Sequence, residues 1–324
     1  YAAIGAVGML GLSVVDPDLY RRYWRYGYAT MVVALLLVLP FGTEVRGSQR
    51  WITLGSFQFQ PSELGKLLLI LSVGAFLADR SRQLTDSRVV FSAIALTALP
   101  ASLVFVQPDI GTSLVYCAAL AAMLFVAGVR WLHLGLLTTA VVTLAVSVVW
   151  ALPAVGVQVL EDYQMKRLTA FVDRDAELQG AGYNVEQSIL AIGAGGLRGR
   201  GVEGATQTNF DYLPEHATDF AFASLAEQRG FMGAAILLLL YLLVVWRGLR
   251  VLTFAPDAYS AIVAGGIVLA LLFQMFVNVG MTMGIAPVTG IPLPFVSVGG
   301  SSLITNLLAV GVLQSIYARG RRRA

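Results

Sequence analysis

The sequence predicts an all-α fold, a polytopic membrane helical bundle with a large extracytoplasmic loop. Of the 324 residues, 57% are hydrophobic and only 13% are charged, whereas soluble domains carry about 25% charged residues. A chain with so few charges could not cover a water-facing surface, but it could face lipid. Two further observations support this fold class: apolar stretches close to the roughly 17–25 residues that cross a bilayer, and arginines gathered at the ends of those stretches.

Nine apolar stretches are predicted to span the membrane as helices and to form one integral membrane domain over residues 1–324. They cover residues 1–15, 24–42, 62–78, 89–106, 111–128, 131–153, 231–246, 258–280 and 301–317. The first stretch is short and the chain opens inside it at Tyr1. We therefore expect one more hydrophobic helix to precede it in the natural protein.

Arginine clusters set the orientation of these spans. If the spans alternate in direction, all the clusters fall on one side of the membrane, which the positive-inside rule makes cytoplasmic. The clusters contain Arg21, Arg22, Arg25, Arg80, Arg82, Arg88, Arg130, Arg247, Arg250, Arg319, Arg321, Arg322 and Arg323. The opposite, extracytoplasmic side receives residues 43–61, 107–110, 281–300 and the large loop 154–230, where we expect function to lie.

The charge and cysteine counts exclude several classes of site. The net charge of +3 comes from arginines at helix ends, so we expect no nucleic-acid partner. Cys117 is the single cysteine, and His133 and His216 are the two histidines. Disulfides, thiolate metal sites and a histidine metal cluster are therefore not expected.

The large loop is predicted to contain short amphipathic helices. One is indicated by apolar residues at roughly helical spacing, which suits a helix lying at the membrane interface; these are Leu160, Tyr163, Leu168, Phe171 and Val172. A second short helix is predicted over residues 185–192. Thr218 is then predicted to be the N-cap of a helix that runs through Glu227 into the seventh span.

Asp219 is the first candidate for chemistry. In a helix that starts at Thr218, it would lie in the first turn, where the helix dipole stabilises a carboxylate. It could act as a base or hold a divalent cation. Acidic residues are also common in first turns simply as support for the cap, so the residues alone leave both interpretations open.

The run from Gly193 to Gly201 resembles a phosphate cradle but lacks the Lys-Ser/Thr ending of a P-loop, and no strand precedes it. We therefore favour close backbone packing for these glycines. Arg198 and Arg200 within the run are different, because two guanidiniums on the outer face would suit an anionic lipid phosphate.

Two outer-face pairs carry further candidates. Arg50 and Trp51 follow an apolar span, and a tryptophan at the interface is ordinary anchoring. Glu63 and Lys66 enter the third span, where ionisable groups indicate function by default. Lys66 could snorkel outwards or form a buried pair with an acid. The irregular segment 290–302 must be sheltered by protein or line a cavity if it lies at membrane depth.

Together these motifs resemble the SEDS family (shape, elongation, division and sporulation). The matching stretches lie in register along the whole chain: Arg50-Trp51-Ile52, Gln60-Pro61-Ser62-Glu63, residues 107–113, Gly180-Ala181-Gly182-Tyr183, residues 187–201, residues 213–220 and residues 290–302. The resemblance implies a fold of ten membrane helices with a large extracytoplasmic loop before the eighth helix. The nine predicted spans match that fold if the first helix is missing.

The resemblance also implies a function, a peptidoglycan glycosyltransferase in the bacterial cytoplasmic (inner) membrane. Its expected partners are the substrate lipid II, an undecaprenyl-pyrophosphate-linked disaccharide-peptide, and a class B penicillin-binding protein, besides membrane lipid. The overall similarity leans towards members that act in cell elongation and rod shape. No cofactor is identified, although a divalent cation could assist.

The family's essential aspartate maps onto Asp219, and the tryptophan of its Arg-Trp motif maps onto Trp51. The predicted substrate-binding or supporting residues are Arg50, Trp51, Glu63, Lys66, Arg198, Arg200, Glu215, His216, Thr218, Ser297 and Ser301. Gln228-Arg229 departs from the Glu-Glu or Glu-Leu that is frequent in relatives, which puts any second acid at that position in doubt.

An α-linked donor that gives a β-1,4 product requires inversion and hence a single in-line attack. Such a reaction needs a base near the acceptor hydroxyl and positive charge near the departing pyrophosphate. Asp219 is the candidate base, or the holder of a cation. Lys66, Arg50, Arg198 and Arg200 are candidates to neutralise the leaving group.

Two alternatives belong to other functional classes. A lipid II flippase should keep binding groups along the whole membrane depth, whereas the ionisable residues inside the predicted spans cluster at their outer ends. A scaffold for other cell-wall proteins would not depend on charged residues at the outer face. The sequence favours the enzyme over both.

Overall fold

The computed structural model describes residues 1–45, 48–54, 57–154, 156, 165, 167 and 180–323. Contacts divide the chain into two compact units. Unit 1 comprises Tyr1–Leu136, Val245–Phe273 and Gly299–Ala324, and unit 2 comprises Leu137–Val244 and Gln274–Val298. The single integral membrane domain expected from the sequence stays a prediction.

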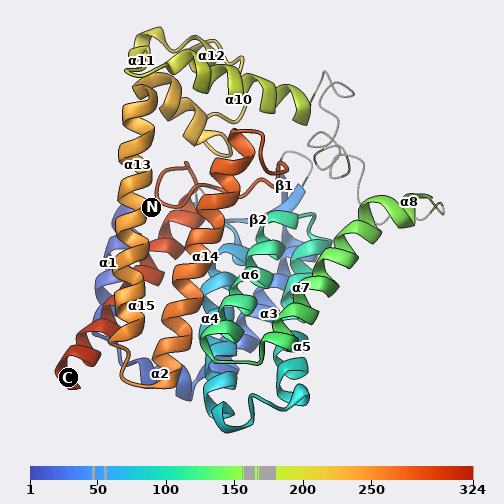
Figure 1. Cartoon of the computed structure of the whole chain (residues 1–324), viewed down its shortest axis with the longest axis vertical. Coiled ribbons are helices and arrows are strands. Elements are labelled where there is room, and N and C mark those ends of the chain that lie inside the picture. Colours follow the sequence, from blue (N-terminus) through green and yellow to red (C-terminus); the bar gives the residue numbers. More distant parts are fainter. Residues whose placement is uncertain are drawn as a thin grey trace. The chain divides into compact units, whose positions relative to one another are not determined.

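Most of the described residues are helical (Figure 1). Unit 1 contains α1 (Ala2–Val14), α2 (Pro17–Arg22), α3 (Trp24–Phe41), β1 (Thr43–Val45), β2 (Ser48–Leu54), β3 (Phe57–Phe59), α4 (Pro61–Asp79), η1 (Ser81–Gln83), α5 (Ser87–Val106), α6 (Ile110–Val126) and α15 (Gly300–Arg323). Unit 2 contains η2 (Ser147–Ala151), α8 (Leu152–Ala154), α10 (Ala181–Gly195), α11 (Gly201–Gly204) and α12 (Thr206–Asn209). Three helices contribute to both units: α7 (Trp131–Val146), α13 (Ala221–Thr253) and α14 (Ala258–Thr282).

Each of the nine predicted spans corresponds to a helix, which confirms the predicted all-α membrane bundle. Within the described residues, six helices are long and apolar enough to cross a membrane: α3, α4, α5, α13, α14 and α15. The helices α1, α6 and α7 are apolar but shorter.

The helix α4 is the centre of unit 1. It contacts α2, α3, α5, α6 and α15. In an apolar stretch of 18 residues, 89% of α4 is buried, against 17% of the corresponding stretch of α3. Glycine allows this close packing: a Cβ added at Gly74 would lie 2.8 Å from the Val263 side chain of α14. A helix that is buried on nearly every side must satisfy its polar side chains within the protein.

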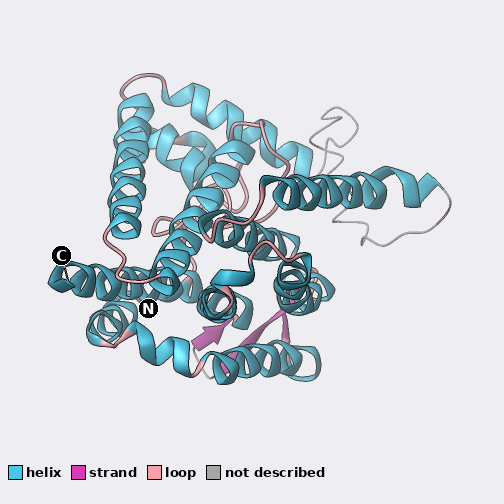
Figure 2. Ribbon diagram, turned by 60° about the horizontal axis from the view of Figure 1, so that its bottom comes forward, coloured by secondary structure: helices cyan, strands magenta, loops and turns pink. Residues whose placement is uncertain are grey.

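A small antiparallel sheet, drawn in magenta in Figure 2, follows α3. The strands run in the order β1-β2-β3, with Thr43 opposite Trp51 and Ile52 opposite Phe59. This segment is predicted to lie on the outer face, and its strands were not predicted. They fit the alternating pattern of residues 57–60, Phe-Gln-Phe-Gln, which is typical of a strand with two different faces.

The predicted N-cap at Thr218 is wrong, because α13 begins three residues later at Ala221. Glu215 adopts a left-handed φ of 58°, and its carbonyl accepts hydrogen bonds from the N–H groups of Thr218 and Phe220, both at 3.1 Å. These bonds make a turn that delays the helix. Asp219 therefore lies in this turn and not in the first turn of α13.

The glycine run after α10 packs against a kink in α13, as predicted for close backbone packing. At Gly230 the helix departs from α geometry, with φ 66° and ψ −167°. The N–H groups of Phe231 and Met232 then donate to Gly196 and Leu197 at 2.8 and 3.2 Å. The glycine run thus satisfies backbone donors that the kink releases from the helix.

The second short helix predicted in the large loop is confirmed as α10, which is longer than the expected 185–192. The predicted amphipathic helix of Leu160 to Val172 falls almost wholly outside the described residues. The core of unit 2 has two apolar clusters. Phe220, Ala223 and Met281 belong to one, and Phe222 and Leu293 to the other.

The packing of α1 along α15 generates a test. A Cβ added at Gly311 would lie 2.5 Å from the Met9 carbonyl oxygen. Overpacking of this kind costs about 1–3 kcal/mol of folding free energy. We therefore expect Gly311→Ala to lower the thermal midpoint of the detergent-solubilised chain. Gly11→Ala is the control, because nothing lies within 4 Å of a Cβ there. Equal midpoints for the two variants would contradict this packing.

Candidate active site

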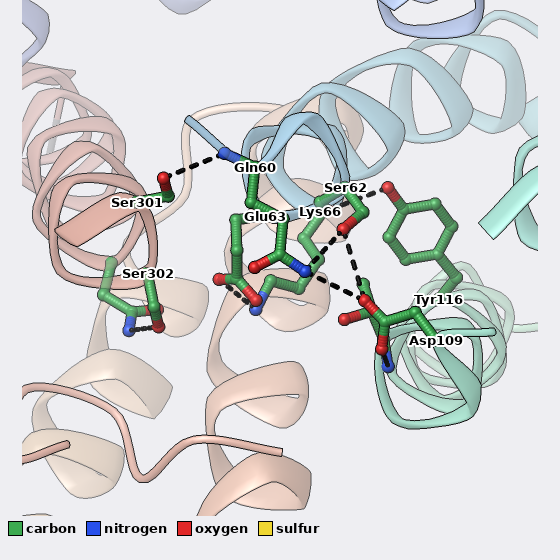
Figure 3. A network of polar contacts seen from close by, with 10 residues as sticks. Gln60, Ser62, Glu63, Lys66, Asp109, Tyr116, Ser301 and Ser302 are labelled. Carbon is green, nitrogen blue, oxygen red and sulfur yellow. Dashed lines mark hydrogen bonds and ion pairs between the residues drawn. The ribbon is translucent and has the colours of Figure 1, made fainter. Parts of the chain in front are cut away.

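Asp109 is the centre of a buried polar network in unit 1 (Figure 3). The residue is 3% exposed, and its Oδ1 accepts the Thr112 N–H at 3.1 Å as the N-cap of α6. Its Oδ2 accepts from Gln60 Nε2 at 3.0 Å and from Ser62 Oγ at 3.4 Å. Several donors thus stabilise a carboxylate that is out of contact with solvent.

Arg50 extends this network to the corner between α5 and α6. Its Nε donates to the Gln107 carbonyl at 3.1 Å, its Nη2 donates to the Pro108 carbonyl, and its Nη1 lies 3.8 Å from Asp109 Oδ1. A guanidinium at the C-terminal carbonyls of α5 is also favoured by the helix dipole. These contacts favour a structural role for Arg50, and the predicted role at the leaving group stays a prediction.

Glu63 and Lys66 form an ion pair on α4, with Lys66 Nζ 2.7 Å from Glu63 Oε2. The two side chains are only 3% and 6% exposed. Of the two possibilities left open for Lys66, snorkelling and pairing, the structure therefore has the buried pair. Removing both charges from water is costly, which is why an ionisable pair at this depth indicates function.

Ser301 ties the start of α15 to the network. Its hydroxyl accepts the Gln60 N–H at 3.0 Å and donates to the Gln58 carbonyl at 3.2 Å. Tyr116 of α6 donates to the Ser62 carbonyl at 2.9 Å. Figure 3 shows these residues beside the Glu63–Lys66 pair.

Figure 3 shows the predicted residues Glu63, Lys66 and Ser301 close together. Arg50 joins them through its contacts with Gln107 and Asp109, and Trp51 is half-buried on β2. Gln60, Asp109 and Tyr116 also belong to this network, although they were not predicted as site residues. Asp109 carried a sequence signal, because an aspartate directly before an apolar span is a typical N-cap. Nothing in the sequence marked Tyr116.

Unit 2 holds Asp219 on a loop that is fixed by backbone hydrogen bonds. Asn278 of α14, which is fully buried, donates through Nδ2 to the carbonyls of Asp219 at 2.9 Å and Ile291 at 2.8 Å. Ser297 Oγ donates to the Thr218 carbonyl at 2.5 Å. Two irregular segments, the turn before α13 and the segment after α14, are therefore joined at the aspartate.

The Asp219 side chain converges with Arg167 on Gly290. A Cβ added at Gly290 would lie 3.6 Å from Asp219 Oδ2 and 3.0 Å from Arg167 Nη1. Gly290 has a φ of 71°, a conformation that favours glycine. Arg167 is not among the predicted site residues, because it lies within the segment predicted as an amphipathic helix at the membrane interface. A carboxylate and a guanidinium thus meet at one backbone position.

The remaining candidates around Asp219 support its loop. Thr218 Oγ1 donates to the Glu215 carboxylate at 2.6 Å. His216 Nδ1 lies 3.2 Å from the Leu213 carbonyl and 3.7 Å from Asp211. The hydrogen bonds of Thr218 and His216 fix the turn that presents Asp219. The 3.7 Å distance from His216 to the 84% exposed Asp211 side chain is too long for a hydrogen bond. A direct contact of Glu215 or His216 with substrate stays a prediction.

Arg198 and Arg200 lie in the glycine run. Arg198 is exposed, and Arg200 bonds within its own region, to the Ala194 carbonyl at 3.1 Å and Thr206 Oγ1 at 3.4 Å. The fully buried Glu227 accepts the N–H groups of Gln207 at 2.8 Å and Thr208 at 3.0 Å. Glu227 is thus a structural residue that anchors α12 to α13.

Asp219 is also predicted from the sequence as a possible ligand of a divalent cation. Among the residues that the structure describes, no three His, Cys, Asp or Glu side chains are grouped so that they could hold a metal ion.

Comparison with known proteins decides the family. Residues 1–322 match the FtsW/RodA/SpoVE family, which is described as cell cycle protein. The chain belongs to this family. The resemblance to SEDS proteins predicted from the sequence is therefore confirmed.

Individual relatives agree with this assignment. The peptidoglycan glycosyltransferase MrdB of Escherichia coli K12 is 39% identical over 317 residues, covering 97% of this chain and 83% of the relative. A second similar protein is a chain from a structure on the coordination of polymerization and crosslinking by a peptidoglycan synthase complex. Its TM-score is 0.82 at 30% identity, and the match covers 98% of this chain and 87% of that chain. The rod shape determining protein RodA of Thermus thermophilus has a TM-score of 0.70 at 27% identity, with 98% and 85% covered.

The buried ion pair of unit 1 generates a second test. Lys66→Met leaves the Glu63 carboxylate buried without this cation, which costs about 3–5 kcal/mol. We expect the double variant Glu63→Gln/Lys66→Met to be more stable than Lys66→Met in thermal unfolding. Arg21→Met is the control, because the Arg21–Asp79 pair is 38% and 42% exposed and should contribute only about 0–1 kcal/mol. A loss from Lys66→Met as small as that from Arg21→Met would contradict the buried pair.

Proposed function

We propose that this chain polymerises lipid II into β-1,4-linked glycan at the outer face of the bacterial cytoplasmic membrane, with Asp219 as the catalytic base. The names of its relatives confirm the predicted peptidoglycan glycosyltransferase activity. The substrate, the membrane face and the residue are our proposal. The observation that carries the proposal is the convergence of Asp219 and Arg167 on Gly290.

The reaction that we propose is a single in-line displacement. Asp219 takes the proton of the acceptor 4-hydroxyl while that oxygen attacks C1 of the donor sugar. The bond from C1 to the phosphate oxygen breaks, and undecaprenyl pyrophosphate leaves with the bonding electrons. A base close to the reacting hydroxyl is worth typically 10²–10⁴-fold in rate.

Arg167 supports the charge side of the same reaction. A guanidinium forms strong, often bidentate, hydrogen bonds to phosphate oxygens, and negative charge develops on the pyrophosphate as the sugar departs. Arg167 therefore joins Arg198 and Arg200 of unit 2 as a candidate to neutralise the leaving group. The loop that carries Asp219 is fixed by Asn278 and Ser297, which suits a base that must be held in place.

We further propose that the chain works with a class B penicillin-binding protein. The similar chain with a TM-score of 0.82 comes from a peptidoglycan synthase complex that coordinates polymerization and crosslinking. A partner that crosslinks the new strands would consume the glycan product of this chain. The leaning towards elongation is supported by relatives that are named MrdB and RodA.

We expect Asp219→Asn to lower lipid II polymerisation by about 10²–10⁴-fold, measured with purified protein as glycan strands separated on a gel. Asp211→Asn is the matched control. Asp211 lies on the same loop with its side chain 84% exposed, and asparagine tolerates its left-handed φ of 56°. Wild-type protein assayed with a chelator separates the two roles: unchanged activity supports the base, and lost activity supports a cation. Normal polymerisation by Asp219→Asn would contradict both.

Gly290→Ala should reduce polymerisation at least tenfold, because the new methyl would displace Arg167 and crowd Asp219. Gly128→Ala carries comparable backbone strain at a φ of 81°, with nothing within 4 Å of its Cβ, and should keep its activity. Left-handed backbone costs roughly 1–2 kcal/mol in both variants, so thermal midpoints should fall alike. Equal activities in the two variants would refute the convergence on Gly290.

A further inference from the structure

A cavity of about 820 Å³ opens in unit 1 where α2 meets the start of α3 and the end of α4. Its lining includes the charged residues Asp18, Arg21, Arg22, Arg25 and Asp79. None of the residues proposed for glycan synthesis lines it. A volume of this size is within the range of small-molecule and cofactor sites.

One wall of the cavity is fixed by contacts between helices. Arg21 donates to Asp79 Oδ1 through Nε at 2.9 Å and through Nη2 at 2.7 Å, which joins α2 to the end of α4. The Trp24 ring packs edge-on against Phe76 of α4 at 6.4 Å between centroids, and the Trp24 carbonyl accepts from Ser72 Oγ at 3.2 Å. The cavity therefore has a built floor.

Two guanidiniums at the cavity remain available for an anion. Arg22 and Arg25 are exposed, and their guanidinium carbons lie 5.8 Å from the Tyr23 ring and 5.6 Å from the Trp24 ring. Among the described residues, neither arginine forms an ion pair with a carboxylate. Since Arg21 is already bonded to Asp79, Arg22 and Arg25 are the arginines of the lining that could bind an anion.

The mouth of the cavity continues into an apolar stripe on α3. Tyr26 and Ala29 line the cavity, and Val33 and Leu36 follow them at i+7 and i+10 from Tyr26, on the same helix face. Tyr26, Val33 and Leu36 are 72%, 54% and 45% exposed. Because α3 is a candidate membrane span, we expect this stripe to face lipid tails.

We propose that this cavity binds an anionic phospholipid. The phosphodiester headgroup lies between Arg22 and Arg25, and an acyl chain follows Tyr26, Val33 and Leu36 along α3. Guanidiniums are suited to phosphate oxygens, and basic pockets between membrane helices are known sites for anionic headgroups. A soluble phosphate would use the arginines but leave the apolar stripe unoccupied.

Native mass spectrometry of the full-length purified chain in detergent tests this proposal. We titrate phosphatidylglycerol and phosphatidylcholine with identical acyl chains. Wild-type protein should retain phosphatidylglycerol more tightly. The double variant Arg22→Gln/Arg25→Gln should lower that affinity roughly thirtyfold, the factor expected for two guanidiniums beside an anionic headgroup, and leave phosphatidylcholine binding unchanged.

Two controls separate the cavity from diffuse charge and from a soluble anion. Arg82→Gln/Arg88→Gln removes the same charge from two exposed arginines outside the lining and should keep wild-type affinity. Glycerol 3-phosphate should not displace the lipid. The proposal is overturned if wild type does not distinguish the two lipids, if both double variants lose affinity equally, or if glycerol 3-phosphate competes as well as the lipid.

A change in the stripe gives an independent readout that leaves the arginines in place. Val33→Asn should weaken phosphatidylglycerol binding, since a polar side chain replaces an exposed apolar one beside the acyl chain. Thermal midpoints close to that of wild type are expected in all variants, because the Arg21–Asp79 and Trp24–Phe76 contacts are untouched and an exposed contact between an arginine and an aromatic ring contributes only about 0.5–1 kcal/mol. Undiminished lipid affinity in Val33→Asn would exclude the α3 stripe as part of the site.

Discussion

The buried ion pair between Glu63 and Lys66 is the constraint on which the arrangement of unit 1 depends. Both charges lie on α4, the helix that its neighbours enclose most completely. Where water is excluded, every polar group needs a partner in the protein. Around the same end of α4, Gln60 and Ser62 bond Asp109, and Ser301 bonds Gln60. The helices α4, α6 and α15 are thereby joined by groups that would be costly to leave unpaired.

The same constraint operates on backbone groups in unit 2. The segments before α13 and after α14 are irregular, so their carbonyls lack helical partners. Asn278 and Ser297 supply those partners. At the Gly230 kink the roles are reversed, because carbonyls of the glycine run accept the N–H groups that the kink releases. The bonds from Asn278 and Ser297 suit the role that we propose for Asp219, because they hold its loop in place outside regular structure.

The sequence predicted the features that depend on local composition. Apolar stretches located the helix at each of the nine predicted spans, and the glycines after α10 pack as expected. Thr218 was a plausible cap, but the left-handed Glu215 closes a turn there first. The strands went unpredicted because β1 and β3 have only three residues each. Arg167 and Gly290 lie far apart in the chain, so their convergence on Asp219 depends on tertiary structure that no local pattern encodes. The role of Asp219 itself came from the family motif.

The most direct test of the account measures synthesis and translocation in the same preparation. Vesicles that contain lipid II are reconstituted with wild-type chain or with Asp219→Asn, and glycan strands and lipid II movement across the bilayer are followed together. The account predicts strands with wild type, none with Asp219→Asn, and no difference in translocation between the two. Translocation that requires the chain, with no glycan made by wild type, would contradict it and favour a flippase.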